Sequence, residues 1–501
     1  MNKYDFVIIG SGLGGLLTSY ILAKEGFNVC VLEKNHQFGG ASQNFVRNNV
    51  VFDTGIHYIG SFDKGQVLYN YFKYFKLSDR LNLKKLDTNA FDIVSFDNDN
   101  KEYNYANGYN AFKENILKHF PEEKQAVNKY ISDLQKIKES YPLYNLQLPG
   151  DIFSEKTNYN TISASAYLEN LTSNKKLRSV LAGTNLLYAG EKDKTPLSVH
   201  ALINNTYIES AYKFIGGSSQ MIDLLVDQIR SFGGTVINKK EVTAFGFDNK
   251  KISYAETSDG EKYFADNFIS NFHPKETFKL VPKEKVRKIY YNRISNLENT
   301  ISTFAFYIIL KPNSLEYKNS NYYHYKDWND IWCAGSYSPQ TWPNTYMLVS
   351  SLDSADSKYA NGLSVLTYMN MEEVSKWKNT KIGKRGADYK EFKARKTEQM
   401  LEYLEKRFPG IKQKIDKIYT SSPLTYRDYI GCSDGSIYGI RKDATNWNTS
   451  LVLPKTKIPN LLFTGQNVNL HGVLGVTIAS VITSSYVLGM DYVLNKIKAE
   501  I

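Results

Sequence analysis

The residues with the clearest chemical meaning are three glycines, Gly10, Gly12 and Gly15, and an acid about 20 residues further on, Glu33. In a Gly-x-Gly-x-x-Gly pattern the first glycine turns the chain, the second lets the backbone approach a pyrophosphate, and the third lets a helix lie close to a strand. A carboxylate at the position of Glu33 accepts hydrogen bonds from a ribose and disfavours a 2′-phosphate. These four residues predict a site for a dinucleotide.

The segments around the glycines are those that such a site requires. Residues 4–9 form a short apolar run that stops at glycine, which is typical of a buried parallel strand. The run after Leu13 has a helical pattern up to Gly26, and residues 28–32 form a second strand that ends at Glu33. The N–H groups at the start of the helix would face the phosphates. A glycine-rich turn without a ligand is disfavoured, because strand, helix, second strand and acid are in register.

Length and composition indicate a globular protein with more than one core. The chain has 501 residues, and 42% of them are hydrophobic. The net charge of +11 is spread along the sequence. This disfavours a nucleic acid partner and leaves two alternatives, a solvated lysine-rich surface or contact with an anionic membrane surface.

Cys30, Cys333 and Cys432 have no C-x-x-C spacing, and the histidines have no metal-ligand spacing, so neither a disulfide framework nor a metal site is expected.

Two features of the sequence bear on the cellular location of the protein. The first strand begins within the first five residues and leaves no room for a leader peptide, so we expect a cytoplasmic protein. Peripheral contact with the inner face of the cell membrane is a further option. Residues 473–490 are strongly apolar but are interrupted by Ser, Thr and Gly, so we predict a buried helix there instead of a membrane-spanning one.

Other patterns predict the remaining elements. Apolar runs that end at small residues predict further strands of the dinucleotide sheet, at residues 235–242, 268–271 and 460–463. Runs without intervening helices predict a separate antiparallel sheet, at residues 302–310, 345–350 and 363–370. Residues 66–150 are polar with apolar residues at helical spacing, so we expect helices that either pack on a core or lie on a membrane surface.

The predicted fold class is therefore α/β, with a Rossmann-type dinucleotide-binding domain built on a parallel sheet and a substrate domain of antiparallel sheet and helices. The first domain is assigned to residues 1–65, 211–290 and 426–501. The second is assigned to residues 66–210 and 291–425, whose helices could face a membrane. No second strand-coupled glycine pattern occurs, so a separate NAD(P) domain is not expected.

Several motifs together resemble a known family. They are the N-terminal fingerprint with Glu33, the doublet Gly39-Gly40, the segment from Phe52 to Gly60, the triplet Gly216-Gly217-Ser218, and the C-terminal Thr464-Gly465-Gln466 with residues 471–475. The chain resembles the phytoene desaturase-like FAD oxidoreductases, closest to the branch of retinol saturases and carotenoid isomerases. The resemblance implies FAD as cofactor, a two-domain flavoprotein fold and a hydrophobic polyene substrate taken from a membrane.

The resemblance also implies roles for individual residues. The backbone from Ser11 to Gly15 would face the pyrophosphate, Glu33 the adenosine ribose, and Val242 the adenine, while the helix beginning near Val473 would face the flavin ring. The implied cofactor-binding residues are Gly10, Ser11, Gly12, Leu13, Gly14, Gly15, Glu33, Lys34, Gly39, Gly40, Ser42, Gly55, Ile56, Val242, Gly465, Gln466, Val473, Leu474 and Gly475.

Three positions depart from the family pattern. Ala41 stands where the desaturase branch usually has arginine, which disfavours a desaturase and an amine oxidase. Asn467 stands where the saturase branch often has an acid, and Phe214 replaces a proline that is common before the central glycine pair.

The reaction on a polyene would need a proton donor near the flavin. His57 is the first candidate, and Tyr58 and His471 are the second. Each could instead be an ordinary buried residue with its polar atoms satisfied. Tyr207, Tyr212 and the cluster 322–325 could line an apolar tunnel or fill a core, and Arg427 with Asp428 is expected to form an ion pair.

The leading hypothesis is an FAD-dependent oxidoreductase that acts on carbon–carbon double bonds of a polyene, by saturation or by redox-neutral cis–trans isomerisation. A polyene desaturase, a flavin-bearing lipid carrier without turnover and an amine oxidase remain as alternatives. The sequence does not identify the electron donor.

Overall fold

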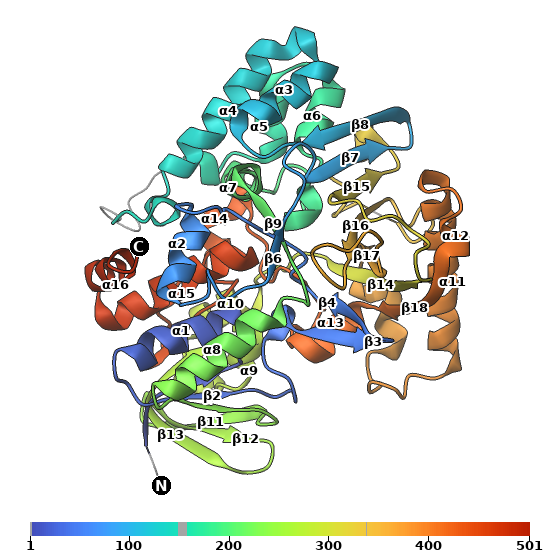
Figure 1. Cartoon of the computed structure of the whole chain (residues 1–501). Helices are drawn as coiled ribbons and strands as arrows, with labels where there is room; N and C mark the ends of the chain where they lie inside the picture. The colour runs from blue at the N-terminus through green and yellow to red at the C-terminus, as the bar shows by residue number, and fades with distance from the viewer. Residues whose placement is uncertain (1–2, 149–157, 337) are drawn as a thin grey trace.

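The computed structural model describes residues 3–148, 158–336 and 338–501. Two seven-stranded sheets organise these residues. In Figure 1 the first sheet lies at the bottom beneath helices α1 and α8, the second lies at the right, and a group of helices, α3 to α6, lies at the top.

The first sheet has the order β10-β2-β1-β13-β12-β11, and β19 also pairs with β13. Strands β10, β2, β1, β13 and β19 are parallel, whereas β11 and β12 are antiparallel additions. The strands are β1 (Tyr4–Ile9), β2 (Val29–Leu32), β10 (Thr235–Ile237), β11 (Val242–Asp248), β12 (Lys251–Thr257), β13 (Lys262–Ser270) and β19 (Leu461–Phe463). The predicted strands 268–271 and 460–463 are thereby confirmed as neighbours in the parallel sheet.

The prediction of one strand over residues 235–242 was wrong. β10 ends at Ile237 and β11 begins at Val242. Between them the chain turns, with Lys239 at a φ of +56° and Lys240 N donating to Glu33 O at 2.8 Å. The turn sends the chain from one edge of the sheet to the other.

Three helices cover the parallel strands closely. α1 (Leu13–Lys24) is buried at every residue except Lys24 and packs between α8 (Ser219–Ser231) and α15 (Gly472–Leu488). Such all-round burial explains the uniformly apolar sequence of α1. The predicted buried helix near residues 473–490 is confirmed as α15, after which Gly489 adopts a φ of +89° and α16 (Met490–Lys498) begins.

The second sheet has the order β18-β14-β17-β16-β15-β7-β8, and all of its pairs are antiparallel except β15 with β7. The strands are β7 (Asp92–Phe96), β8 (Asp99–Tyr105), β14 (Ser302–Leu310), β15 (Asn321–Tyr325), β16 (Thr345–Ser351), β17 (Gly362–Met369) and β18 (Ile415–Ser421). The predicted antiparallel sheet is confirmed. α11 (Ala387–Arg407) packs its apolar side chains against one face of this sheet.

The helical group rests on the other side of the second sheet. It contains α3 (Tyr109–His119), α4 (Lys124–Glu139), α5 (Ala164–Leu171), α6 (Lys175–Leu181) and α7 (Leu197–Glu209). The predicted helical character of residues 66–150, of which 149 and 150 lie outside the described residues, was only partly right. β7 is buried at all five positions and pairs with β8 through a turn rich in Asp and Asn, so burial on both faces outweighs helical patterning here.

Small strands connect the two sheets. A hairpin is formed by β3 (Asn44–Arg47) with β4 (Val50–Asp53), and a three-stranded sheet has the order β5-β9-β6. The latter strands are Ile59–Gly60, Ala211–Phe214 and Leu83–Lys85. The remaining α-helices are α2 (Val67–Tyr74), α9 (Pro274–Lys279), α10 (Lys288–Ser295), α12 (Ile411–Lys414), α13 (Pro423–Ile430) and α14 (Trp447–Ser450). None of the helices within the described ranges combines the length and apolar character needed to cross a membrane.

A candidate dinucleotide and substrate site

The glycine turn lies where β1 ends and α1 begins. Gly10 has a φ of +94°, in the region that favours glycine, and its N–H donates to Leu32 O at 2.8 Å. A Cβ on Gly15 would lie 2.2 Å from Gly10 O, and a Cβ on Gly12 would lie 2.7 Å from the Asn271 side chain. The turn therefore accepts no side chain at Gly15, and a side chain at Gly12 would displace the Asn271 amide.

Asn271 is a site residue that the sequence analysis did not single out. It follows β13, its N–H donates to Ile9 O at 3.0 Å, and its Nδ2 donates to Gly10 O at 3.4 Å. A Cβ on Gly14 or Gly465 would lie 2.7 or 2.3 Å from its Oδ1. Asn271 therefore packs against both the N-terminal and the C-terminal glycine segments. A polar residue at the carboxyl end of a buried parallel strand is the signal that could have found it.

The Glu33 carboxylate is buried beside the turn. Its Oε2 accepts hydrogen bonds from Ser11 N at 3.0 Å and Ser11 Oγ at 2.7 Å, and its Oε1 accepts from Asn35 N at 2.9 Å. The Ser11 hydroxyl also accepts from Gly39 N at 3.2 Å. These bonds fix the acid, the glycine turn and the Gly39-Gly40 doublet relative to one another.

A cavity of about 290 Å³ runs from the glycine turn into the space between the two sheets. The sequence-predicted residues that line it are Gly10, Gly12, Leu13, Gly14, Glu33, Lys34, Gly39, Gly40, Ser42, Gly55, Ile56, His57, Tyr58, Val242, Gly465, Gln466, His471 and Val473. Ser11 and Gly15 do not line it and instead hold the turn in place. Leu474 and Gly475 line a smaller neighbouring cavity of about 50 Å³.

Two helices begin at the cavity without a side-chain cap. α1 starts after Gly12 and α15 starts after His471, and neither has an acidic residue in its first turn. Their first N–H groups and the positive ends of their dipoles are therefore available to an anionic group. With the side-chain-free turn and Glu33, this arrangement fits a dinucleotide.

The other half of the cavity is aromatic and apolar. The rings of Tyr58 and Tyr207 are 4.4 Å apart, those of Tyr438 and His471 are 4.3 Å apart, and aliphatic side chains complete the wall. The aliphatic members include Leu187, Met347 and Leu366. Of the tyrosines considered for a tunnel, Tyr207 lines the cavity, whereas Tyr212 and residues 322–325 do not. Tyr322, Tyr323 and Tyr325 instead fill cores beside β15.

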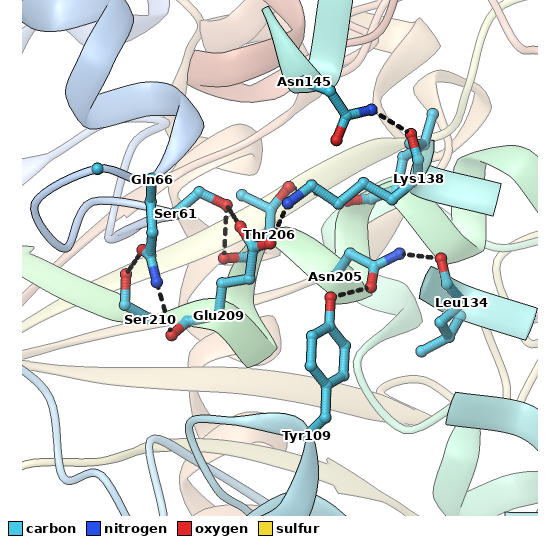
Figure 2. A network of polar contacts seen from close by, with 12 residues as sticks. Ser61, Gln66, Tyr109, Leu134, Lys138, Asn145, Asn205, Thr206, Glu209 and Ser210 are labelled. Atoms are coloured by element: carbon cyan, nitrogen blue, oxygen red, sulfur yellow. Dashed lines mark hydrogen bonds and ion pairs between the residues drawn. The ribbon is translucent and has the colours of Figure 1, made fainter. Parts of the chain in front are cut away.

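A polar network holds the helix that carries Tyr207 (Figure 2). Asn205 on α7 accepts a hydrogen bond from Tyr109 Oη at 2.7 Å and donates to Leu134 O at 2.6 Å. Glu209, at the end of the same helix, pairs with Lys138 and accepts from Ser61 Oγ at 2.6 Å. α7 is thus tied to α4 on one side and to the segment after β5 on the other.

The two candidate histidines lie in the cavity wall, where His57 is buried and His471 is half-buried. His57 Nε2 has no hydrogen-bond partner among the described residues. Burial and the nearby Lys213 charge lower the pKa of His57 to about 4. His471 Nε2 lies 2.9 Å from Leu187 O, and burial lowers the pKa of His471 to about 4. Both imidazoles are therefore neutral at pH 7, and His471 carries its hydrogen on Nε2 because a carbonyl can only accept.

A half-buried acid, Asp53, and a buried base, Lys213, interact near His57. Asp53 Oδ1 accepts from Ser218 N and Ser218 Oγ, both at 2.7 Å, and burial raises the pKa of Asp53 to about 6. Lys213 Nζ donates to Ser350 O, and burial lowers the pKa of Lys213 to about 7. The attraction between these two groups opposes both shifts.

Tyr58 connects the cavity wall to the second sheet. Its hydroxyl donates to Asp92 Oδ2 at 2.8 Å and lies 2.6 Å from Tyr323 Oη. Asp92 begins β7 and Tyr323 lies on β15, so both partners come from strands of the sheet. Sequence analysis placed Asp92 in a helical segment and did not consider it.

α13 closes the cavity near Lys34. Lys34 Nζ donates to Asp428 O at 2.7 Å, and the expected ion pair of Arg427 with Asp428 is confirmed at 2.7 Å. Arg385 also pairs with Asp428. Asn467, a departure from the family pattern, lines the cavity, and its Oδ1 accepts from Ile440 N at 2.9 Å.

The fold and the glycine turn define a protein of the Rossmann dinucleotide-binding class, and a family model described as an NAD(P)-binding Rossmann-like domain matches residues 8–75. Solved structures share the fold over almost the whole chain. An oxidoreductase from Methanosarcina mazei has a TM-score of 0.65 at 18% identity and covers 95% of this chain and 98% of its own. A putrescine oxidase variant has a TM-score of 0.66 at 11% identity and covers 99% of both chains.

The similarity in sequence is more specific. All-trans-retinol 13,14-reductase from Rattus norvegicus is 27% identical, over 97% of this chain and 86% of that protein. The protein of the same name from Homo sapiens gives the same figures. Prolycopene isomerase 1 from an Oncidium hybrid cultivar is 24% identical, over 87% of this chain and 75% of that protein. The predicted resemblance to the retinol saturase and carotenoid isomerase branch is confirmed.

Proposed function

We propose that the protein binds FAD in this cavity and acts on carbon–carbon double bonds of a hydrophobic polyene, by saturation or by redox-neutral cis–trans isomerisation. The observation that carries the proposal is the cavity itself. One continuous space joins a dinucleotide-type glycine turn with Glu33 to an apolar wall of tyrosine, leucine and methionine side chains. Relatives over most of the chain are named for the reduction of retinol and the isomerisation of prolycopene.

In the proposal, residues from three parts of the chain hold FAD. The turn from Gly10 to Gly15 and the start of α1 face the pyrophosphate, Glu33 faces the adenosine ribose, and the main chain of Val242 faces the adenine. Gly39, Gly40, Ser42, Gly465 and Gln466 line the middle of the cavity, and the start of α15 lies at the flavin end. FAD, when bound, supplies hydride chemistry that side chains cannot perform.

The chain's own residues bind and orient the polyene and keep water out. Tyr207 and Tyr58 present ring faces to the cavity, and Leu187, Met347 and Leu366 add apolar surface. A conjugated chain can lie along such a wall without leaving polar groups unpaired. His57, Tyr58 and His471 remain the proposed groups for moving a proton, at Nε2 of the histidines and Oη of the tyrosine.

The proposed division of labour follows the two sheets. The FAD-binding domain comprises residues 1–65, 211–290 and 426–501, and the substrate domain comprises residues 66–210 and 291–425. All strands of the first sheet fall in the former ranges and all strands of the second in the latter. The proposal includes peripheral contact with the inner face of the cell membrane, because a polyene partitions into lipid.

The decisive experiment combines absorbance with product mass. The purified protein, as isolated or after reconstitution with FAD, is expected to be yellow, and a colourless protein after reconstitution contradicts the proposal. The anaerobically reduced protein is then mixed with retinol or with a cis-lycopene. A gain of two hydrogens indicates saturation, and an unchanged mass with altered geometry indicates isomerisation. A loss of two hydrogens by the oxidised protein would indicate a desaturase, and binding without any conversion would indicate a carrier.

A further inference from the structure

Asp92 is a carboxylic acid without a counter-ion in the interior of the protein. It is fully buried, and no Lys, Arg or His within the described ranges forms an ion pair with it. Its Oδ1 accepts from Asn321 Nδ2 at 2.9 Å and its Oδ2 is bonded to Tyr58 Oη at 2.8 Å. Both partners are neutral, although a buried carboxylate normally requires a cation.

A short chain of hydrogen bonds connects this acid to the cavity. Tyr58 lines the cavity, whereas Asp92 and Tyr323 do not. The Tyr58 hydroxyl lies between them, 2.8 Å from Asp92 Oδ2 and 2.6 Å from Tyr323 Oη. Tyr58 therefore lines the cavity and is hydrogen-bonded to the buried acid.

Apart from Asp92 itself, the ionisable groups of this cluster among the described residues are phenols. They are Tyr58, Tyr323 on β15, Tyr105 on β8 and Tyr207 on α7, and burial raises the pKa of each above its usual value. Burial also raises the pKa of Asp92 to about 7, while its hydrogen bonds to Asn321 and Tyr58 lower it. The acid is therefore the group in this cluster that exchanges a proton near neutral pH.

We propose that Asp92 and Tyr58 form the proton donor of the reaction, with Asp92 as the store and Tyr58 Oη as the atom that delivers the proton to the substrate carbon. The proposal rests on the proposed function and assigns one of its steps. Tyr58 is the catalytic residue, because it faces the substrate, and Asp92 acts through it.

In saturation, one carbon of the double bond would take a hydride, which reduced FAD would supply when bound, and its neighbour would take the proton. As the new C–H bond forms, the O–H bond of Tyr58 breaks. At the same time the Asp92 carboxyl group transfers its proton to the Tyr58 oxygen. The electron pair of the Asp92 O–H bond stays on Asp92, which becomes a carboxylate. Water that enters the cavity after product release returns the proton through Tyr58.

The hydrogen-bond directions support this order of events. A protonated Asp92 can donate to the Tyr58 oxygen, and the phenol hydrogen of Tyr58 is then no longer held by Asp92. An ionised Asp92 accepts that hydrogen instead. The neighbouring ionisable groups are less suited to donate the proton. His57 and His471 are neutral at pH 7, and Lys213 Nζ is bonded to Ser350 O and does not line the cavity.

The test compares two tyrosines that touch each other. Tyr58→Phe removes the hydroxyl that is bonded to Asp92, on a residue that lines the cavity, and Tyr323→Phe removes the neighbouring hydroxyl of a residue that does not line it. In the FAD-loaded protein, reduced and mixed with the polyene that the wild type converts, Tyr58→Phe is expected to slow a single turnover by about 10²–10⁴-fold. Tyr323→Phe is expected to retain most of the wild-type rate. Equal rates for Tyr58→Phe and wild type, or equal losses in both variants, would overturn the proposal.

A second measurement does not depend on turnover. The infrared carbonyl stretch of a protonated, buried carboxyl is followed with pH in the FAD-loaded protein without substrate. We expect a band that disappears as the pH rises through about 7 and that is missing from Asp92→Asn. Asp53, whose pKa burial raises to about 6, is expected to add a second band that Asp92→Asn retains. Equal carbonyl bands in Asp92→Asn and wild type at pH 5 would refute the role of Asp92. If the wild type converts no polyene, the proposed function itself fails, and the infrared result still reports on the acid.

Discussion

The hydroxyl of Ser11 donates to Glu33 Oε2 at 2.7 Å, inside the protein and beside the glycine turn. The same hydroxyl accepts from Gly39 N, and Ser11 N is bonded to the same carboxylate oxygen. One serine thus holds three segments that meet at the cavity. Its side chain does not line the cavity, so its effect on a ligand is indirect, through the position of Glu33.

Ser11→Ala is therefore expected to weaken both the fold and cofactor retention. A hydrogen bond to a buried charged group contributes about 1.5–3 kcal/mol, and its loss leaves a carboxylate oxygen with one donor fewer. Thermal unfolding and the ratio of bound flavin to protein measure the two effects. Ser485→Ala is the matched control, because its hydroxyl bonds only within α15 and to Met490. A Ser11→Ala protein that behaves like this control would contradict the role assigned to Ser11.

Gly14→Ala should abolish cofactor binding for a steric reason. Its Cβ would lie 2.6 Å from Gly465 Cα and 2.7 Å from Asn271 Oδ1, at the junction of both chain ends. Gly26→Ala is the control, since nothing lies within 4 Å of its Cβ, although its φ of +88° adds strain of about 1–2 kcal/mol. We expect flavin content to fall in the first variant only. Full flavin content in Gly14→Ala would contradict the predicted steric clash.

Asp92→Asn should change how stability depends on pH. Burial raises the pKa of Asp92 to about 7 in the folded protein, from an ordinary value of 3.8, so the folded state binds the proton more tightly than the unfolded state. Stability from this group is therefore lost as the pH rises from about 4 through about 7. The melting temperature of Asp92→Asn relative to wild type should be higher at pH 8 than at pH 5. An unchanged difference between the two pH values would contradict the burial of this acid without a counter-ion.

Lys213→Met should raise the pKa of His57. Burial and the Lys213 charge both lower the pKa of His57. The substitution removes the charge and leaves the burial unchanged. The pKa should rise but stay below the ordinary value of 6.5. Nuclear magnetic resonance of labelled histidine follows it, with His200 as an internal reference because it is buried between Tyr130 and Tyr188 and its pKa is lowered by burial alone. A shift of equal size at His200 would indicate a general change in the fold.

The parts of the site that sequence could predict are those encoded locally. The sequence pattern predicts the glycine turn, Glu33 and the start of α15, because each of them lies within one short segment. Strand endings such as residues 268–271 and 460–463 could also be placed, because parallel strands end at one edge of the sheet.

The parts that sequence could not predict depend on contacts between distant strands. Asp92 is chemically ordinary in the sequence and becomes unusual only when β7 pairs with β15 and the segment after β4 brings Tyr58 against it. Tyr322 and Tyr323 illustrate the same limit. Successive residues of a strand face opposite sides, so Tyr323 joins the Asp92 cluster while Tyr322 packs toward α11.

Thr18 and Thr464 share a hydrogen bond of 2.9 Å although 446 residues separate them. During translation, the fingerprint near Thr18 is made long before the strand that completes its surroundings. The surroundings of the fingerprint therefore stay incomplete until residue 464 has been made. We expect the proposed FAD to bind only after that point.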